Sequence, residues 1–172
     1  MTCQGRKASG IKAPSFKGLQ PASASASRSK SKNKRVDTSH ELLLRRKLWR
    51  LGLRFRKHVS SLPGKPDVIF PSVKVAVFCG GDFWHGRNWT VLKRNLGVGT
   101  NSSYWTAKIS SNMKRDARNT ALLKAMGWYV IRVWETDIQR DPIDMACRVK
   151  KAVSLRRTRK TRSCDRVKRL VS

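Results

Sequence analysis

Apolar residues recur at helical spacing in three segments of the chain. In the first, Leu44, Leu48 and Leu51 lie on one side of a helix predicted over residues 40–51. Polar residues suited to capping precede this helix, and Gly52 follows it as a stop signal. The pattern therefore predicts an amphipathic helix with one side against a core.

A longer helix is predicted over residues 104–126, with apolar residues gathered on one side and basic residues on the other. An Asn-Ser-Ser run caps it and Gly127 ends it. A third helix is predicted from Pro142, after a capping aspartate, to about Leu155. Residues 90–99 are basic and are expected to form a loop.

Strand patterns occupy the segments between these helices. Four segments show alternating or continuous strand-forming residues: 53–59, 67–70, 73–79 and 128–134. A turn at Pro71 joins the second and third in an antiparallel hairpin, so Asp67 is expected near residues 79–82. This order predicts an α/β domain with a mixed central sheet flanked by helices.

The charge of the chain indicates its partner. The net charge is +29, from 39 Lys and Arg against 10 Asp and Glu, which favours binding to a polyanion such as nucleic acid. An anionic membrane would also attract this charge, but the sequence has neither a long apolar run nor a signal peptide. We therefore expect a cytoplasmic, nucleoid-associated protein that binds DNA.

The charge also divides the chain into three parts. Residues 1–32 contain no acid and include an Ala-Ser repeat, which predicts a disordered basic arm. This arm is expected either to contact phosphates or to be a solvated tail without function. Residues 33–155 are assigned to the folded domain, and residues 156–172 to a basic C-terminal tail.

The densest candidate chemistry follows the strand predicted over residues 73–79. Two glycines end this strand, and Asp82, two aromatic residues and His85 come next. Metal-assisted phosphodiester hydrolysis needs a carboxylate for Mg²⁺, a base for water and a positive groove for the substrate. Asp67 supplies the carboxylate, His85 the base, and the basic segments the groove. These features predict an enzyme that cuts DNA.

Six short motifs occur together over about residues 31–137. They are Glu41-Leu42-Leu43-Leu44-Arg45-Arg46, Leu62-Pro63-Gly64-Lys65-Pro66-Asp67, Phe83-Trp84-His85-Gly86, Tyr104-Trp105-Thr106-Ala107-Lys108-Ile109, Arg115-Asp116, and Gly127-Trp128-Tyr129-Val130 with Val133-Trp134-Glu135. Their combination resembles the very-short-patch-repair (Vsr) DNA mismatch endonucleases. The resemblance implies a restriction-endonuclease-like, PD-(D/E)XK fold and Mg²⁺-dependent nicking of one strand 5′ of a thymine mispaired with guanine.

The resemblance also implies roles for individual residues. Asp67 looks like the metal carboxylate, and the main-chain carbonyl of Cys79 like a further metal ligand. His85 looks like the catalytic histidine, supported by Asp116, and Glu41 looks like the acid on the first helix of the family. For Glu41 the alternative is a favourable place near the helix dipole, and for Asp116 a salt bridge on the helix surface.

Other residues are expected to contact DNA. Phe83 and Trp84 look like the rings that wedge into the base stack beside the mismatch, where unstacking costs less. Their alternative is ordinary core packing. Arg87, Lys65 and Lys114 are expected to bind the DNA backbone.

The departures from the family pattern change the expected site. Zinc-binding members have Cys or His at four positions that differ in this chain, namely Asp82, Arg87, Trp89 and Thr136. With the four cysteines also scattered, we expect no structural zinc and reduced thiols. Asp82 is expected to be either a second metal ligand or a structural residue. The second active-site histidine falls at Gly80, and the acid-x-Lys motif of the wider nuclease class is absent.

Three functions therefore stay open from the sequence. The first is Mg²⁺-dependent nicking of mismatched duplex DNA by a monomer, in concert with mismatch-repair proteins. The second is site-specific cleavage of homing type, because Vsr-like cores resemble some of those enzymes. The third is a non-catalytic DNA-binding protein that keeps the fold.

Overall fold

The sheet of the molecule has three strands and mixed direction. The computed structural model describes residues 14–19 and 36–171, with side chains described as far as Thr161. Strands β1 (Val68–Phe70), β2 (Val75–Gly80) and β3 (Tyr129–Trp134) lie in the order β1-β2-β3. The first pair is antiparallel and the second parallel, which confirms the predicted hairpin and the α/β class.

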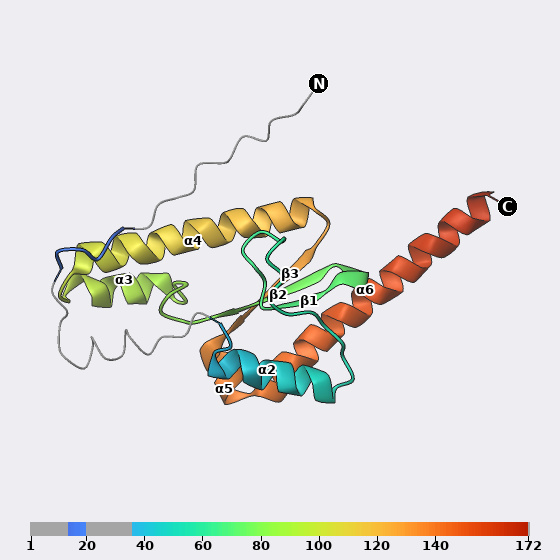
Figure 1. Cartoon of the computed structure of the whole chain (residues 1–172), viewed down its shortest axis with the longest axis horizontal. Helices are drawn as coiled ribbons and strands as arrows, with labels where there is room; N and C mark the ends of the chain where they lie inside the picture. Colours follow the sequence, from blue (N-terminus) through green and yellow to red (C-terminus); the bar gives the residue numbers. More distant parts are fainter. Residues whose placement is uncertain (1–13, 20–35, 172) are drawn as a thin grey trace, which may run out of the picture.

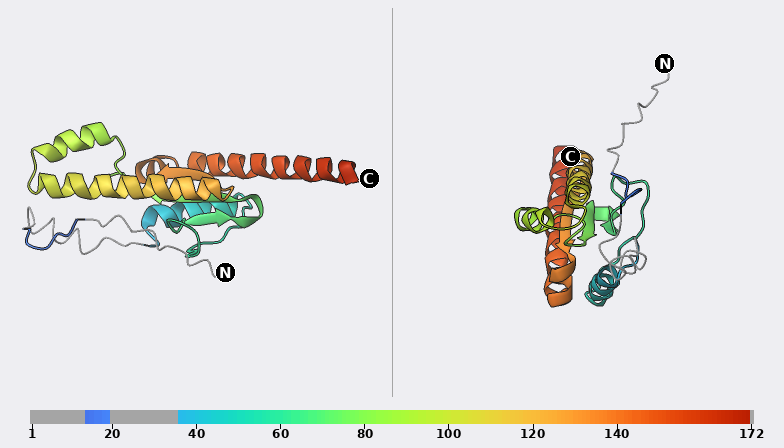
Figure 2. Two further views of the ribbon diagram at one scale, coloured as in Figure 1. Left: turned by 90° about the horizontal axis from the view of Figure 1, so that it is seen from above. Right: turned by 90° about the vertical axis from the view of Figure 1, so that its left-hand side faces the viewer.

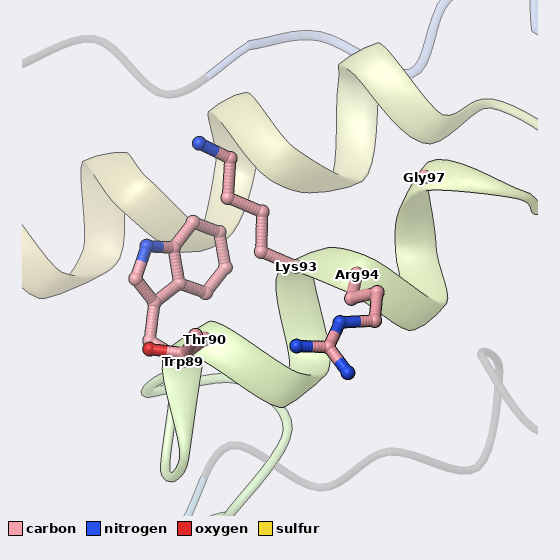
Figure 3. Close-up of a pocket in the computed structure, with 5 residues that line it drawn as sticks. All are labelled: Trp89, Thr90, Lys93, Arg94 and Gly97. Carbon is pink, nitrogen blue, oxygen red and sulfur yellow. The ribbon is translucent and has the colours of Figure 1, made fainter.

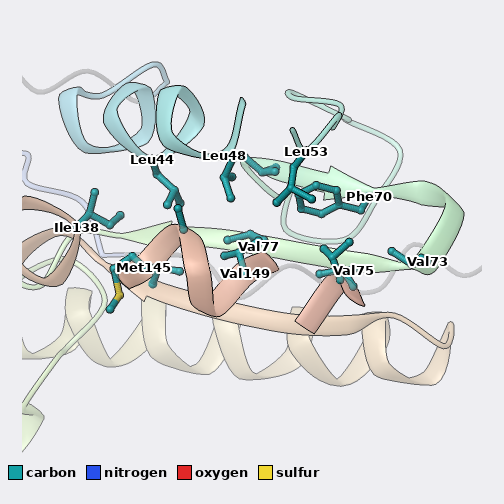
Figure 4. Packing of buried hydrophobic residues seen from close by; sticks show 14 residues of the cluster. Leu44, Leu48, Leu53, Phe70, Val73, Val75, Val77, Ile138, Met145 and Val149 are labelled. Carbon is teal, nitrogen blue, oxygen red and sulfur yellow. The ribbon is translucent and has the colours of Figure 1, made fainter. Parts of the chain in front are cut away.

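Helices cover both faces of this sheet. Helix α2 (Ser39–Arg50) and helix α6 (Pro142–Val171) pack on one face, and α4 (Ser102–Ala125) packs against β3 on the other (Figures 1 and 2). Between α2, the sheet and α6 lies the larger buried cluster, which Figure 4 shows: Leu44, Leu48, Val75, Val77, Ile138, Met145 and Val149 are among its members. The apolar stripe predicted for the first helix is therefore its core-facing side.

Two glycines end helices as the sequence predicts. Gly52, with φ of 77°, follows α2, and Gly127, with φ of 81°, follows α4. Both adopt the left-handed conformation that side chains with a Cβ avoid. The chain then turns, and after Gly127 it enters β3 directly.

Two predictions between the helices are wrong. Residues 53–59 do not form a strand: only Arg56 bridges Ile69, and His58 has φ of 55°, which is incompatible with extended backbone. Residues 90–99 are not a loop, because α3 spans Trp89–Gly97. Trp89, Leu92 and Leu96 of α3 recur at helical spacing and are half-buried, and α3 packs against α4. The basic residues between them obscure this short pattern in the sequence.

The C-terminal helix is longer than expected. After the short α5 (Glu135–Arg140), α6 continues to Val171 rather than ending near Leu155, and it extends past the sheet in Figure 1. Arg156 fixes it to the sheet by donating to the carbonyl of Gly127 at 2.7 Å. No Gly or Pro follows Pro142 in this segment, so nothing in its sequence interrupts the helix.

Most of the predicted basic arm lies outside the described residues. Within residues 14–19, the ring of Phe16 makes an edge contact with Tyr104 at a centroid separation of 4.9 Å. No helix in the described part of the chain is long and apolar enough to cross a membrane.

Candidate active site

Asp67 lies at the start of β1, beside the carboxyl end of β2. Its Oδ2 accepts a hydrogen bond from the main-chain N–H of Cys79 at 2.7 Å. The antiparallel register, in which Val68 pairs with Val77, brings the two residues together. The proximity expected between Asp67 and the end of the second strand is therefore confirmed.

The surroundings of Asp67 favour a bound cation. Burial raises the pKa of Asp67 to about 6, the hydrogen bond from Cys79 opposes this rise, and the negative charge of Glu41 adds to it. A divalent cation would stabilise both carboxylates. Mg²⁺ commonly binds through one or two carboxylates and keeps several waters, so the Asp67 carboxylate is a ligand of the type it takes. In the described part of the chain, no third acid, His or Cys completes a cluster.

Glu41 is buried in the first turn of α2, where it organises the helix start. Its carboxylate accepts from Arg45 Nη2 at 2.6 Å, from Thr38 Oγ1 at 2.8 Å and from the main-chain N–H of Asp37 at 3.1 Å. Both oxygens are thus engaged by protein donors. Glu41 acts on Asp67 through its charge, and its own contacts match the helix-start alternative.

His85 and Asp116 form a close pair between the loop after β2 and α4. Nδ1 of His85 lies 2.5 Å from Oδ2 of Asp116. A carboxylate accepts, so Nδ1 carries the proton and Nε2 is left as the proton-accepting nitrogen. Burial opposes ionisation of Asp116, but the hydrogen bond of His85 and the charges of His85, Arg132 and Arg115 outweigh it and hold the pKa of Asp116 below its ordinary value.

The loop of residues 81–88 has a fixed shape. The N–H of His85 donates to the carbonyl of Gly81 at 3.2 Å, and Asn112 Nδ2 donates to the carbonyl of Trp84 at 3.0 Å. Gly86 has φ of 67°, and a Cβ there would lie 2.5 Å from Met113 Sδ. Only glycine permits this approach, so the loop is held against α4 with His85 beside Asp116.

A second set of contacts holds the same loop to α5. Arg87 bridges Asp82 and Asp137, with each nitrogen-to-oxygen distance 2.9 Å. The other oxygen of Asp82 accepts from the main-chain N–H and the hydroxyl of Thr136, at 2.9 and 2.5 Å. We call Asp82, Arg87, Thr136 and Asp137 the loop clamp.

The loop clamp contains three of the four positions, Asp82, Arg87 and Thr136, at which the resemblance implies zinc ligands in other members. A guanidinium and a threonine hydroxyl are not ligands that zinc selects, and both Asp82 oxygens are already hydrogen-bonded. The residues present therefore do not fit zinc. The fourth position, Trp89, lies on α3 and lines an open hollow of about 520 Å³ with Thr90, Lys93, Arg94 and Gly97, which Figure 3 shows.

An aromatic cluster lies beside His85. Phe83 is 37% exposed, and its ring makes edge contacts with Trp84 and Trp105 at 5.2 and 5.7 Å between centroids. Phe83 is therefore not an ordinary core residue. Sequence reasoning missed Trp105 as a member of this cluster, because its helical spacing with Ile109 suggests only an apolar helix side.

The other expected DNA contacts differ in their surroundings. Lys65 and Lys114 are exposed, as a phosphate contact requires. Arg87 instead points both terminal nitrogens at carboxylates of the loop clamp. On α3, Lys93 and Arg94 are also exposed, and sequence reasoning did not assign them a role.

Known proteins are similar in sequence to this chain. Residues 20–91 match the family model described as DNA mismatch endonuclease Vsr. Type II nicking enzyme V.NmeDIP of Neisseria meningitidis serogroup C is 43% identical over 121 residues, which are 70% of this chain and 80% of that protein. V.HpaIIP of Haemophilus parainfluenzae, also named a type II nicking enzyme, is 39% identical over 121 residues, 70% of this chain and 84% of its own.

The DNA mismatch endonuclease Vsr of Escherichia coli K12 is also similar. It is 36% identical over 99 residues, which are 58% of this chain and 62% of that protein. The residues matched by the family model include β1, β2 and the loop of residues 81–88, which carry Asp67 and His85. The chain is therefore a DNA endonuclease that belongs to the Vsr family.

Proposed function

We propose that this endonuclease uses Mg²⁺ to nick one strand of duplex DNA at a T·G mismatch, in very-short-patch repair. One observation carries the proposal: the carboxylate of Asp67 meets Cys79 at the end of β2, where the next loop presents the His85–Asp116 pair. We also infer a restriction-endonuclease-like core, because a Pro-Asp sequence opens a strand that is antiparallel to its neighbour.

In this proposal Asp67 and the carbonyl of Cys79 hold the metal ion. Bound Mg²⁺ supplies Lewis acidity at the phosphate and makes a bound water more acidic. Nε2 of His85 removes a proton from the attacking water, and Asp116 orients the ring and stabilises its charged form. Glu41 raises the negative potential at Asp67.

DNA recognition is assigned to the exposed rings and cations around this centre. Phe83 and Trp84 enter the base stack at the mismatch, where stacking is weakest, and Trp105 supports them from α4. Lys65 and Lys114 contact the backbone, and we add Lys93 and Arg94 of α3, which are exposed close to the loop. All these groups come from one chain, so we infer that a monomer acts.

In this proposal the loop clamp holds the loop of residues 81–88 in place, where the resemblance implies zinc in other members. It joins the loop of His85 to α5 through charged hydrogen bonds on two elements. We therefore propose a structural role for Asp82 and Arg87, in preference to metal and DNA contacts.

A nicking assay tests the proposed function. Duplexes that differ only in T·G against T·A are incubated with the wild type in Mg²⁺ or in EDTA. We expect one nick, only with the mismatch and only with Mg²⁺. Asp67→Ala should abolish nicking and retain DNA binding, whereas Asp144→Ala, which removes an exposed acid of α6, should keep full activity.

Other outcomes point to the two alternatives. Binding without Mg²⁺-dependent nicking of any duplex would favour a non-catalytic DNA-binding protein. Cleavage of both strands of a matched duplex at one sequence would favour a site-specific enzyme of homing type.

A further inference from the structure

Arg132 lies over Gly80 at the carboxyl end of β2. In the parallel register, Phe78 pairs with Arg132 and Gly80 with Trp134, so these four residues belong to the sheet face that α4 covers. A Cβ on Gly80 would lie 3.3 Å from the Trp134 ring and 3.5 Å from Nη1 of Arg132. The guanidinium thus borders the space that a side chain at position 80 would enter.

The contacts of Arg132 leave its hydrogen-bonding capacity unused. Nη1 lies 3.3 Å from Oδ2 of Asp116, the oxygen that also receives His85. The guanidinium lies 5.4 Å from the centre of the Phe78 ring, and its side chain is 22% exposed. Within the described residues it makes no hydrogen bond of donor geometry, although a guanidinium has five N–H donors. A cation with spare donors therefore borders the His85–Asp116 pair.

We propose that Arg132 is a catalytic residue that binds a non-bridging oxygen of the scissile phosphate. This inference rests on the proposed phosphodiester hydrolysis but not on the identity of the mismatch. In that reaction a water oxygen bonds to phosphorus and its proton passes to His85. The bond from phosphorus to the leaving strand oxygen breaks, and that oxygen takes a proton from water. Arg132 stabilises the negative charge on the phosphate oxygens during this exchange.

Two features of the molecule support a role at the phosphate. Gly80 carries no side chain, and β2 has no lysine after an acid. No residue of β2 therefore supplies a cation beside the His85–Asp116 pair. Arg132 brings one from the neighbouring strand. A guanidinium also matches phosphate geometry with two parallel N–H donors, which lysine cannot do.

Single-turnover nicking tests this role on whichever duplex the wild type cuts. Arg132→Gln should lower the rate about 10²–10³-fold, as loss of one transition-state donor does, with less than about a fivefold change in DNA affinity. Arg132→Lys should recover part of the rate through its charge. Arg148→Gln removes an equivalent charge from the exposed surface of α6 and should stay within about twofold of the wild type.

A sulfur substitution separates contact with phosphate from support of Asp116. Each non-bridging oxygen of the scissile phosphate is replaced by sulfur in turn, and the rate loss is compared between wild type and Arg132→Gln. For one stereoisomer the loss should shrink in the variant, because the contact that sulfur weakens is already gone. Equal losses in both proteins, or a rate for Arg132→Gln within about threefold of wild type, would overturn the proposal.

The outcomes distinguish a failure of the proposed nicking function from a failure of the proposed role of Arg132. A wild type that nicks no duplex with Mg²⁺ contradicts the proposed function itself. A wild type that nicks while Arg132→Gln nicks equally well contradicts only the role of Arg132. If Arg132→Gln fails to fold by thermal melting, the same sulfur comparison is made with Arg132→Lys, whose bond to phosphate is altered but whose charge remains.

Discussion

The two faces of the sheet differ in what they bury. The face under α2 and α6 holds the larger apolar cluster, with side chains such as Leu48 and Val149 fully buried. The face under α4 has a small apolar cluster around Leu123, and toward the carboxyl end of β2 it turns polar, with Arg132 and the His85–Asp116 pair. Charged groups need partial access to water and substrate. The proposed proton-transfer pair therefore lies where the apolar core is thin.

The largest expected effect concerns activity on the α4 face. His85→Gln should lower the single-turnover nicking rate about 10²–10⁴-fold, because the water loses its proton acceptor. Chemical denaturation should show little change in the free energy of unfolding. His58→Gln is a matched control, since His58 pairs with Asp37 at 3.1 Å outside the site. If both variants nick at equal rates, the proposed role of His85 as the proton acceptor is contradicted.

The next effect concerns stability on the opposite face. Leu48 is fully buried between α2 and the sheet, so Leu48→Ala should lower the free energy of unfolding by about 2–5 kcal/mol. Urea titration measures this loss. The rate constant of the folded fraction should remain within about twofold of wild type. A rate that falls in step with stability would show that the two faces are coupled.

The next prediction concerns how Asp67 makes the stability of the folded chain depend on pH. The unfolded carboxyl titrates near 3.8, whereas burial keeps it protonated to about pH 6 in the folded chain. As the pH rises above 3.8, Asp67 ionises more readily in the unfolded chain than in the folded chain, so the folded state loses stability. This loss of stability becomes constant above about pH 6. Without metal, Asp67→Asn should be more stable than wild type by up to ~3 kcal/mol at about pH 7.5, and by almost nothing near pH 3.5. Thermal melts in EDTA across this range measure the difference, and a pH-independent gain contradicts it.

The smallest expected effect concerns the loop clamp. Arg87→Met leaves Asp82 and Asp137 without their shared partner and should cost roughly 1 kcal/mol, since Arg87 is partly exposed. Arg140→Met is the control, because Arg140 is 75% exposed and contacts only Asp137 in the described region. Nicking should fall more in the first variant, because the loop also carries His85. Equal melting temperatures and nicking rates for the two variants would contradict the stabilising role of the loop clamp.

Several elements could be predicted because the hydrophobic pattern and the residues that begin or end the element agree. The first helix has an apolar stripe, a first-turn acid and a following Gly52, and β1 and β2 are apolar runs joined by a turn. Elsewhere pattern and structure diverge. Residues 53–59 alternate like a strand, but His58 has a left-handed backbone and pairs with Asp37 instead. Helix α3 has a short apolar pattern at Trp89, Leu92 and Leu96, but the basic residues between them obscure it in the sequence.

The candidate site shows the same division. Asp67 and His85 were proposed from the sequence because they are residue types that the chemistry requires, and Asp116 was proposed from the family resemblance. Arg132 was not, because a single arginine in an apolar strand gives no signal until the register places it over Gly80. The partnership of Asp82 with Thr136 was equally hidden, since 54 residues separate them along the chain.

The sequence by itself determined the charge of the molecule and its main helices and hairpin, and it supplied the candidate residues for activating the nucleophile. These follow from side-chain chemistry and local backbone preference, which act over a few residues. The tertiary structure decided which groups meet: Asp67 with Cys79, His85 with Asp116 and Arg132, and Arg87 with two carboxylates. Those contacts depend on strand register and helix packing, which join residues distant in the chain and leave no periodic trace in it.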